Sequence, residues 1–421
     1  MSPDRLPIRR NTILLSASLA ANSGTLQLSA AVASLTLVLV IGTSGLLGLG
    51  PAIVLASGAL AALPAGRAMD RLGRVPVLAT GFGVGAAGCG LAALGSTLGS
   101  APAVLAGLVG VGAASGTALL ARAAAGDMYP PERRARGIAL VLFGAVFGAI
   151  LGPAVFSPLL SGRELDGDAL GLLWLAAGGF MVAALALVLC VRPDPKRIAE
   201  LLHTADDVVP GPAAPIRELI RRPGAIPALI AGQASFAVMV GVMTLTGAVV
   251  VDHQGHAGHT VFPIIGAHVL GMYALVLVVG DVIDRIGRIP ALAGGLLVMG
   301  VSVSSLLWVQ SVPATAAVLF GLGIGWNLSF VAATAQLADC AHAWERGKLL
   351  GFNDLLSGMT GAGLALLGGF ALSAIGVAAL AIGGTVLVLA PALWIVRNGA
   401  AFSAAAPPLP APGSASPGHP G

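Results

Sequence analysis

The sequence predicts an all-α membrane protein with twelve transmembrane helices in two pseudo-symmetric six-helix bundles. Three observations lead to this prediction: the composition, the number of long apolar runs, and a repeat between the two halves of the chain. Of the 421 residues, 57% are hydrophobic and only 10% are charged, whereas soluble domains carry about 25% charged residues. A soluble core could not bury this much apolar surface, so the lipid bilayer is expected to be a partner of the whole chain.

Twelve apolar runs are each long enough to cross a bilayer, which takes about 20 residues at a rise of about 1.5 Å per residue. The runs are 13–38, 45–66, 75–96, 101–125, 138–160, 170–191, 225–250, 262–280, 291–310, 313–338, 349–371 and 374–396. The first run is too long for the apolar region of a signal peptide, so we expect it to be a permanent span.

A polar linker divides these runs into six and six. Residues 193–224 form this central loop, between an N-terminal bundle at 1–192 and a C-terminal bundle at 225–397. Residues 398–421 are rich in Ala, Pro, Gly and Ser, so they are expected to form a disordered tail.

Basic residues concentrate in the loops on one side of the predicted spans. They include Arg9, Arg10, Arg71, Arg74, Arg133, Arg134, Arg217 and Arg285, whereas Arg163 alone lies in a loop on the other side. Because cytoplasmic loops carry the excess of Lys and Arg, both termini are expected to be cytoplasmic. The formal net charge of +4 follows from this topology, and we expect no nucleic acid partner.

The two halves carry copies of one loop motif. GRAMDRLGRVP (66–76) follows the second span, and GDVIDRIGRIP (280–290) follows the eighth. The shared residues are Gly66, Asp70, Arg71, Gly73 and Arg74 in the first copy and Gly280, Asp284, Arg285, Gly287 and Arg288 in the second. A second pair of segments, DMYPPERRARG (127–137) and DCAHAWERGK (339–348), follows the fourth and tenth spans. Internal repeats of this kind are typical of secondary transporters.

The repeated loop has the residue types of a gate. Its glycines permit a tight turn, and Asp70 can cap a helix end or pair with a cation, for which Arg122 is the candidate. The simpler interpretation is that the basic residues only set the topology. We favour gating, because the motif recurs in both halves.

The seventh and eighth spans place soft ligands at matching depths. Met239 and Met243 are four residues apart in FAVMVGVMTLTG, and His268 and Met272 are four apart in GAHVLGMYA, so each pair shares a helix face. Because the two spans run antiparallel, Met243 matches His268 in depth and Met239 matches Met272. If the faces meet, three thioethers and one imidazole converge.

This set of side chains favours copper. Thioethers favour Cu(I) and imidazole suits copper, whereas hard cations need carboxylates, which neither span offers at this depth. With 9 methionines in the chain, random placement gives about 0.2 pairs spaced four apart. Methionine also fills gaps in helix packing, but a histidine inside a span by default marks a functional site. We therefore predict a metal site at these four residues.

The loop between these spans, VDHQGHAGHT, holds His253, His256 and His259. Short histidine-rich tracts often bind metal, so this cluster is expected to collect copper at the outer mouth. The alternative is an ordinary solvated loop.

The G-x-x-x-D-R-x-G-R loops at 66–74 and 280–288 resemble the signature loop of the major facilitator superfamily. The methionine and histidine pairs resemble those of its CcoA-like copper importer branch. This resemblance implies two bundles that rock about a central cavity and copper uptake across the bacterial inner membrane, with copper as the transported substrate and no cofactor. It also implies a monomer and an unidentified cytoplasmic copper acceptor. Related branches carry organic solutes, so a transporter of a riboflavin-like solute or a drug is the alternative.

Asp354 lies about two turns into the eleventh span. It can exchange a proton during transport, or brace the inner gate together with Asn353, which we favour. No set of nucleophile, base and catalytic metal ligands lies at one depth, and no Walker loop is present, so we expect the chain not to be an enzyme. A copper sensor is disfavoured, because it would not need repeated gate loops.

Overall fold

The computed structural model describes residues 6–42, 49–160, 166–202, 213–248, 250, 254–255, 261–375 and 377–404. This part of the chain is helical with short turns and contains no strand, as the prediction of an all-α protein requires. The histidine cluster at His253, His256 and His259 lies outside the described residues.

Within the described residues, seventeen α-helices and one short 3-10 helix follow one another. They are α1 (Ile8–Ile41), α2 (Leu49–Leu72), α3 (Arg74–Leu98), α4 (Ala101–Leu119), α5 (Ala121–Asp127), η3 (Pro131–Arg133), α6 (Arg134–Leu142), α7 (Gly144–Leu160), α8 (Gly167–Leu189), α9 (Pro195–Leu202), α10 (Ile216–Leu219), α11 (Ala225–Ala248), α12 (Val261–Tyr273), α13 (Val276–Ile286), α14 (Arg288–Ser305), α15 (Val312–Asp339), α16 (Arg346–Ile375) and α17 (Val377–Ala404).

Several of these helices combine into longer membrane spans. Within the described ranges, nine helical segments are long and apolar enough to cross a membrane, and the pair α12 and α13, bent by 43°, makes a tenth. The helices α1 and α16, of 34 and 30 residues, also exceed the length of about 20 residues that a span needs. Helices suit this environment, because each satisfies its own backbone hydrogen bonds where water is absent.

One sequence expectation is wrong at the end of the chain. Helix α17 continues to Ala404, so residues 398–404 are helical and do not belong to a disordered tail. The alanines that follow Gly399 favour helix, and the Asn398 side chain donates a hydrogen bond to the carbonyl of Trp394, one turn earlier (2.8 Å).

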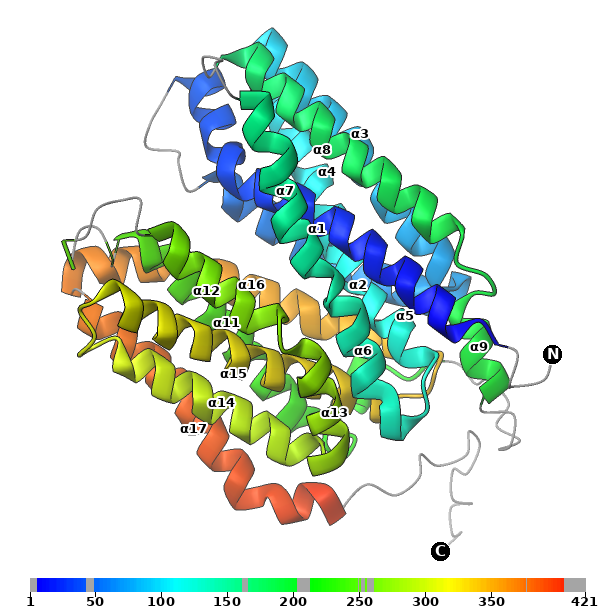
Figure 1. The fold of residues 1–421 in the computed structure, drawn as a ribbon. Coiled ribbons are helices and arrows are strands. Elements are labelled where there is room, and N and C mark those ends of the chain that lie inside the picture. Colours follow the sequence, from blue (N-terminus) through cyan, green and yellow to red (C-terminus); the bar gives the residue numbers. More distant parts are fainter. Residues whose placement is uncertain are drawn as a thin grey trace, which may run out of the picture.

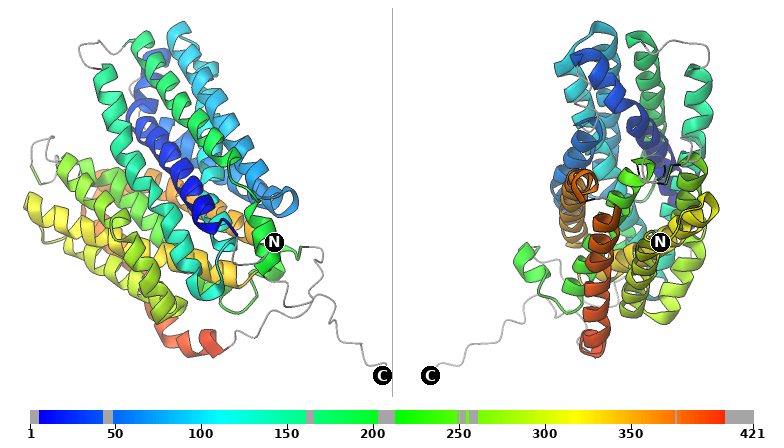
Figure 2. Two further views of the ribbon diagram at one scale, coloured as in Figure 1. Left: turned by 45° about the vertical axis from the view of Figure 1, so that its right-hand side comes forward. Right: turned by 90° about the vertical axis from the view of Figure 1, so that its left-hand side faces the viewer.

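The helices form two bundles, α1 to α8 and α11 to α17, joined by the linker that carries α9 and α10 (Figure 1). Helix α1 begins and α17 ends at the same end of the molecule as α9. We call this end the linker side; it contains α9, the ends of α2 and α13, and the start of α16. The bundles touch near the linker side and diverge toward the opposite end (Figures 1 and 2).

Glycines allow the two bundles to approach closely along α2 and α16. A Cβ added to Gly66 would overlap the backbone of Gly347, and one added to Gly358 would lie 2.6 Å from the Cβ of Ala59. Small residues at such crossings let helix backbones come into van der Waals contact. Along this crossing of α2 and α16, the two bundles therefore meet backbone to backbone, with little side chain between them.

A side chain at Gly66 should separate the two bundles. In Gly66→Val, relief of the overlap requires α16 to move, so we expect a loss of at least ~1 kcal/mol and a thermal unfolding midpoint in detergent lower by ~2 °C or more. The matched control is Gly83→Val on α3, where no atom lies within 4 Å of an added Cβ. Equal midpoints for the two variants would contradict this close approach.

Candidate functional site

The first candidate gate residue, Asp70, lies at the end of α2 and bonds to the opposite bundle. Its carboxylate accepts hydrogen bonds from the backbone N–H groups of Gly347 (2.9 Å) and Lys348 (2.6 Å), in the first turn of α16. These N–H groups have no partner within their own helix and carry the positive end of the helix dipole. Asp70 therefore caps a helix, which is one of the two roles expected for it.

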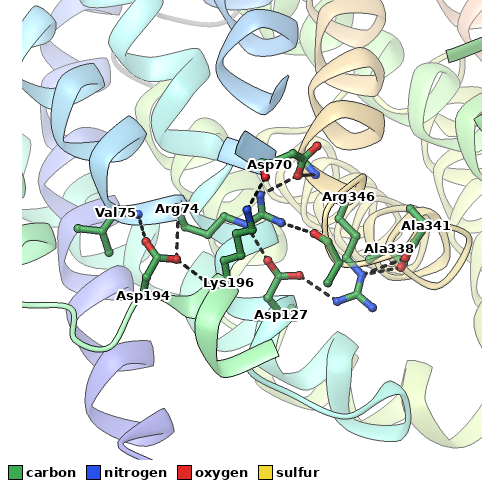
Figure 3. Close-up of polar contacts among 12 residues, drawn as sticks. Asp70, Arg74, Val75, Asp127, Asp194, Lys196, Ala338, Ala341 and Arg346 are labelled. Atoms are coloured by element: carbon green, nitrogen blue, oxygen red, sulfur yellow. Dashed lines mark hydrogen bonds and ion pairs between the residues drawn. The ribbon is translucent and has the colours of Figure 1, made fainter. Parts of the chain in front are cut away.

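Arg74 and Asp127 connect this cap to a wider network of buried charges (Figure 3). Arg74 pairs with Asp70 (2.7 Å) and Asp127 (2.7 Å), and Asp127 also pairs with Arg346 of the opposite bundle (2.9 Å). The side chains of Arg74 and Asp127 are fully buried. We call Asp70, Arg74, Asp127 and Arg346 the first latch; its charges are paired and hydrogen-bonded, which is what their burial requires.

The second copy of the motif forms an equivalent network between α13 and α6. Asp284 accepts hydrogen bonds from the backbone N–H groups of Ala135 (3.3 Å) and Arg136 (3.0 Å), and it pairs with Arg288 (2.6 Å). Asp339 pairs with Arg288 (3.2 Å) and with Arg134. We call Asp284, Arg288, Asp339 and Arg134 the second latch.

The two latches differ in burial. The side chain of Asp339 is 27% exposed, whereas that of its counterpart Asp127 is 0% exposed. A less buried ion pair is better solvated and contributes less to stability. The first latch is therefore expected to contribute more to closure of the linker side.

The second glycine of each motif copy directly precedes the next helix: Gly73 precedes α3, and Gly287 precedes α14. Gly73 has φ 101° and Gly287 has φ 91°, a backbone region that only glycine adopts at low cost. Beside Gly73, the Asp194 carboxylate accepts hydrogen bonds from the N–H groups of Arg74 (3.1 Å) and Val75 (2.8 Å).

The remaining motif residues take no part in the latches. Arg71 and Arg285 are exposed at the linker side, and Gly280 lies against the backbone of Arg136.

The far end of the linker also bonds to the start of α16. Glu345 accepts hydrogen bonds from the Arg222 guanidinium (2.6 and 3.2 Å) and from the backbone N–H of Ala214 (2.9 Å). Burial alone would raise the pKa of Glu345, but these hydrogen bonds and the charge of Arg222 lower it below its usual value. Both ends of the linker are therefore bonded to helices that carry the first latch.

Arg122 does not pair with Asp70, so this expectation is wrong. Its guanidinium pairs with Asp354 on α16. Arg122 lies five residues before Asp127 and therefore about 7.5 Å deeper along the helix than the latch. Asp70 instead uses Arg74, which is four residues away. Asp354 therefore lies between the bundles, and its role, as a brace of the gate or as a site of proton exchange, stays a prediction.

A row of aromatic rings extends from this pair into the C-terminal bundle. The guanidinium carbon of Arg122 lies 4.8 Å from the centre of the Phe330 ring. Phe330 stacks on Trp326 (4.8 Å between ring centres), which contacts the edge of Tyr273 (6.1 Å). The sequence analysis does not single out these rings.

The predicted copper ligands lie on α11 and α12. His268 on α12 is fully buried; its Nδ1 lies 2.8 Å from the carbonyl oxygen of Leu319 on α15, and its Nε2 has no hydrogen-bond partner. Met272, one turn further, is 7% exposed. Met239 and Met243 are half-buried on α11.

Helix α12 packs chiefly on α15 and makes only slight contact with α11. The cause is a close glycine crossing: a Cβ on Gly323 would lie 2.5 Å from the carbonyl oxygen of His268. The ring of His268 is therefore oriented by α15, and the expected meeting of the α11 and α12 faces is limited in this conformation.

Residues 12–267 match the family model of the Major Facilitator Superfamily. The chain is similar to the uncharacterized MFS-type transporter YdeG of Bacillus subtilis, with 30% identity over 83% of this chain and 82% of that protein. It is also similar to the riboflavin transporter RfnT of Brucella anthropi, with 32% identity over 71% of this chain and 73% of that protein. Among solved structures, the human organic anion transporter MFSD10 shares the fold, with a TM-score of 0.71 and 17% identity over 93% of this chain and 100% of that one.

Loss of the first latch should open the linker side, and Cys340 can report the opening. This cysteine is 5% exposed and its thiol donates a hydrogen bond to the carbonyl of Pro223. Breaking a buried ion pair costs about 3–5 kcal/mol, so in Asp127→Asn we expect Cys340 to react with a polar maleimide at least about tenfold faster.

The measurement uses a Cys190→Ser background, because Cys190 is exposed. The matched control is Asp168→Asn, which removes an exposed carboxylate in the first turn of α8. Unchanged Cys340 labelling in Asp127→Asn would mean that the first latch does not hold the linker side closed.

Proposed function

Since the chain belongs to the major facilitator superfamily, we propose that it is a secondary transporter that carries copper into the bacterial cytoplasm by alternating access. Its linker side would then face the cytoplasm, as the excess of basic residues there suggests. The two latches would keep this side closed while the opposite side receives the ion, and their release would let the ion leave inward.

The observation that carries the copper proposal is the unpartnered Nε2 of His268. A buried imidazole nitrogen without a hydrogen bond is costly, and the Leu319 carbonyl at Nδ1 fixes the tautomer that leaves Nε2 free to bind a metal. The thioether of Met272 belongs to the same helix face. Together these two groups offer the soft, neutral ligands that suit Cu(I).

Within this proposal, Met239 and Met243 would complete the ligand set when α11 approaches α12 during rocking of the bundles. His253, His256 and His259 would collect copper at the outer mouth. No resident cofactor takes part, since copper is the cargo.

The latches are expected to move as units, because each joins one helix end of one bundle to the first turn of a helix in the other.

A second candidate is a planar organic solute such as riboflavin. Two observations favour it: the similarity to RfnT over 71% of the chain, and the stacked rings of Phe330 and Trp326, which can bind a flat aromatic molecule. Radioactive riboflavin taken up by the wild type, together with the loss of that uptake in Trp326→Ala, would favour this candidate.

Removing a single predicted copper ligand should lower copper uptake without unfolding the protein. Exchange of Met for Leu conserves volume and costs under about 1.5 kcal/mol, so Met272→Leu is a mild structural change. Loss of a ligand should cost at least as much as the 10–100-fold seen for outer-shell groups. We expect copper-starved cells expressing Met272→Leu or His268→Ala to take up at least about tenfold less radioactive copper than wild type.

The matched control is Met299→Leu on α14, a fully buried methionine outside the predicted site, which should transport like wild type. All variants are compared at equal membrane levels. Wild-type uptake no higher than that of empty cells would reject copper transport and return the methionines to helix packing.

A further inference from the structure

The membrane span that carries His268 and Met272 is interrupted directly after Met272. Helix α12 ends at Tyr273 and α13 begins at Val276, and the two helices are bent by 43°. Sharp kinks in helices have identifiable causes, such as a proline or a side chain that enters the hydrogen-bond ladder. Residues 270–279 contain no proline, and the side chain that enters the ladder comes from α15.

This side chain is that of Asn327. Its Nδ2 donates a hydrogen bond to the backbone carbonyl of Met272, which in a continuous helix accepts from the N–H of Val276, four residues later. Asn327 is 1% exposed. Beside this bond, the ring of Tyr273 meets the ring of Trp326 edge-on (6.1 Å between ring centres). Asn327 therefore stabilises the break and holds the turn of α12 that carries Met272.

The same face of α15 holds the other end of this turn. Leu319, Gly323 and Asn327 follow one another at intervals of four residues, so they line one face of α15. The carbonyl oxygen of Leu319 lies 2.8 Å from Nδ1 of His268, and a Cβ on Gly323 would lie 2.6 Å from the backbone N of Met272. One helix surface therefore positions both predicted ligands of α12, His268 through a backbone carbonyl and Met272 through Asn327.

Asn327 makes this bond at a cost to stability. Its Oδ1 is buried and has no hydrogen-bond partner in the described part of the chain, and an unsatisfied buried acceptor costs free energy. Leucine has nearly the same size and carries no polar atom. Packing alone would therefore favour an apolar residue at this position, whereas a bond to the carbonyl of Met272 requires a donor.

The break also separates the predicted copper ligands of the span from its latch. Helix α12 packs chiefly on α15 of its own bundle, whereas α13, which carries Asp284, packs chiefly on α6 of the other bundle. With its last turn bonded to Asn327, α12 can stay on α15 when α13 moves with the second latch. The thioether of Met272 then keeps its position while the linker side opens.

We infer that Asn327 is a positioning residue for copper binding, which fixes the last turn of α12 so that the thioether of Met272 meets the ion. The inference rests on the proposed copper transport. Asn327 does not itself bind the ion, because its Nδ2 is occupied by the carbonyl of Met272 and an amide oxygen is a poor ligand for Cu(I). Its effect on copper therefore acts through Met272.

A double substitution tests whether Asn327 acts through Met272. The Cu(I) affinity of the purified protein, with ascorbate as reductant, is measured in competition with the coloured chelator bicinchoninate. We expect Asn327→Leu to bind Cu(I) at least about tenfold more weakly, as for other groups that orient metal ligands. In a Met272→Leu background the same substitution should change the affinity less than about twofold, because the thioether through which it acts is gone.

The matched control is Ser329→Ala, on the same helix. Ser329 is fully buried, its Oγ has no hydrogen-bond partner among the described residues, and it lies against Gly295 of α14. This variant should bind Cu(I) like wild type. Equal fold losses from Asn327→Leu in the presence and absence of the Met272 thioether would assign Asn327 to general packing and overturn the inference.

A second measurement observes the break without copper. Spin labels at the exposed positions Leu270 on α12 and Ile286 on α13 would be about 24 Å apart along a continuous helix. In a Cys190→Ser background, pulsed electron resonance should give one narrow distance in wild type and Ser329→Ala, and a shifted or broader distance in Asn327→Leu. An unchanged distance in Asn327→Leu would contradict its role in fixing the break.

The copper measurement separates this inference from the function beneath it. Cu(I) binding by wild type that Asn327→Leu leaves unchanged would overturn the role of Asn327 and leave copper transport standing. A wild type that binds no Cu(I) would reject the proposed function, and the positioning of a copper ligand with it.

Discussion

The closed linker side depends on a carboxylate that binds the backbone of a helix from the other bundle. Asp70 holds the N–H groups of Gly347 and Lys348, and these donors cannot rotate away as side chains can. The contact is possible because Gly66 and Gly347 let the two backbones touch. Arg74 then holds Asp70 in place, and Asp127 ties both to Arg346. Opening therefore has to break a set of bonds together, which makes the gate a two-state element.

The repeat of this arrangement at Asp284 shows why the motif occurs twice. Each bundle ends one helix with an aspartate that caps a helix of the other bundle, so the two latches are related by the pseudo-symmetry of the halves. Their burial is unequal, however, with Asp339 more exposed than Asp127. The more solvated second latch is the better candidate to break first as the linker side opens.

The sequence predicts the fold and the capping aspartates well because both leave local signals. Long apolar runs determine helices in lipid, and a repeated motif identifies paired structural positions. Asp127 and Asp339 were missed as latch residues, although both begin the second pair of repeated segments, because pairing across bundles depends on how the bundles sit together. Arg122 was assigned to Asp70 for the same reason. The helical rise argues against that assignment, because Arg122 lies five residues before Asp127 and therefore deeper in the membrane than the latch.

The direction in which a side chain points around its helix is harder to predict. His268 and Met272 share a face, as their spacing requires, but the glycine crossing of α12 with α15 turns that face toward α15. Such a crossing depends on packing between helices far apart in sequence. The proposed copper path therefore requires motion that brings α11 and α12 together, in the same cycle that breaks the latches.

A distance across the linker side tests this cycle most directly. Spin labels at the exposed positions Arg133 and Arg397, one on each bundle, would be measured by pulsed electron resonance with and without Cu(I). The account predicts one short distance without cargo and a second, longer distance when Cu(I) is present. A single distance that Cu(I) leaves unchanged would contradict it.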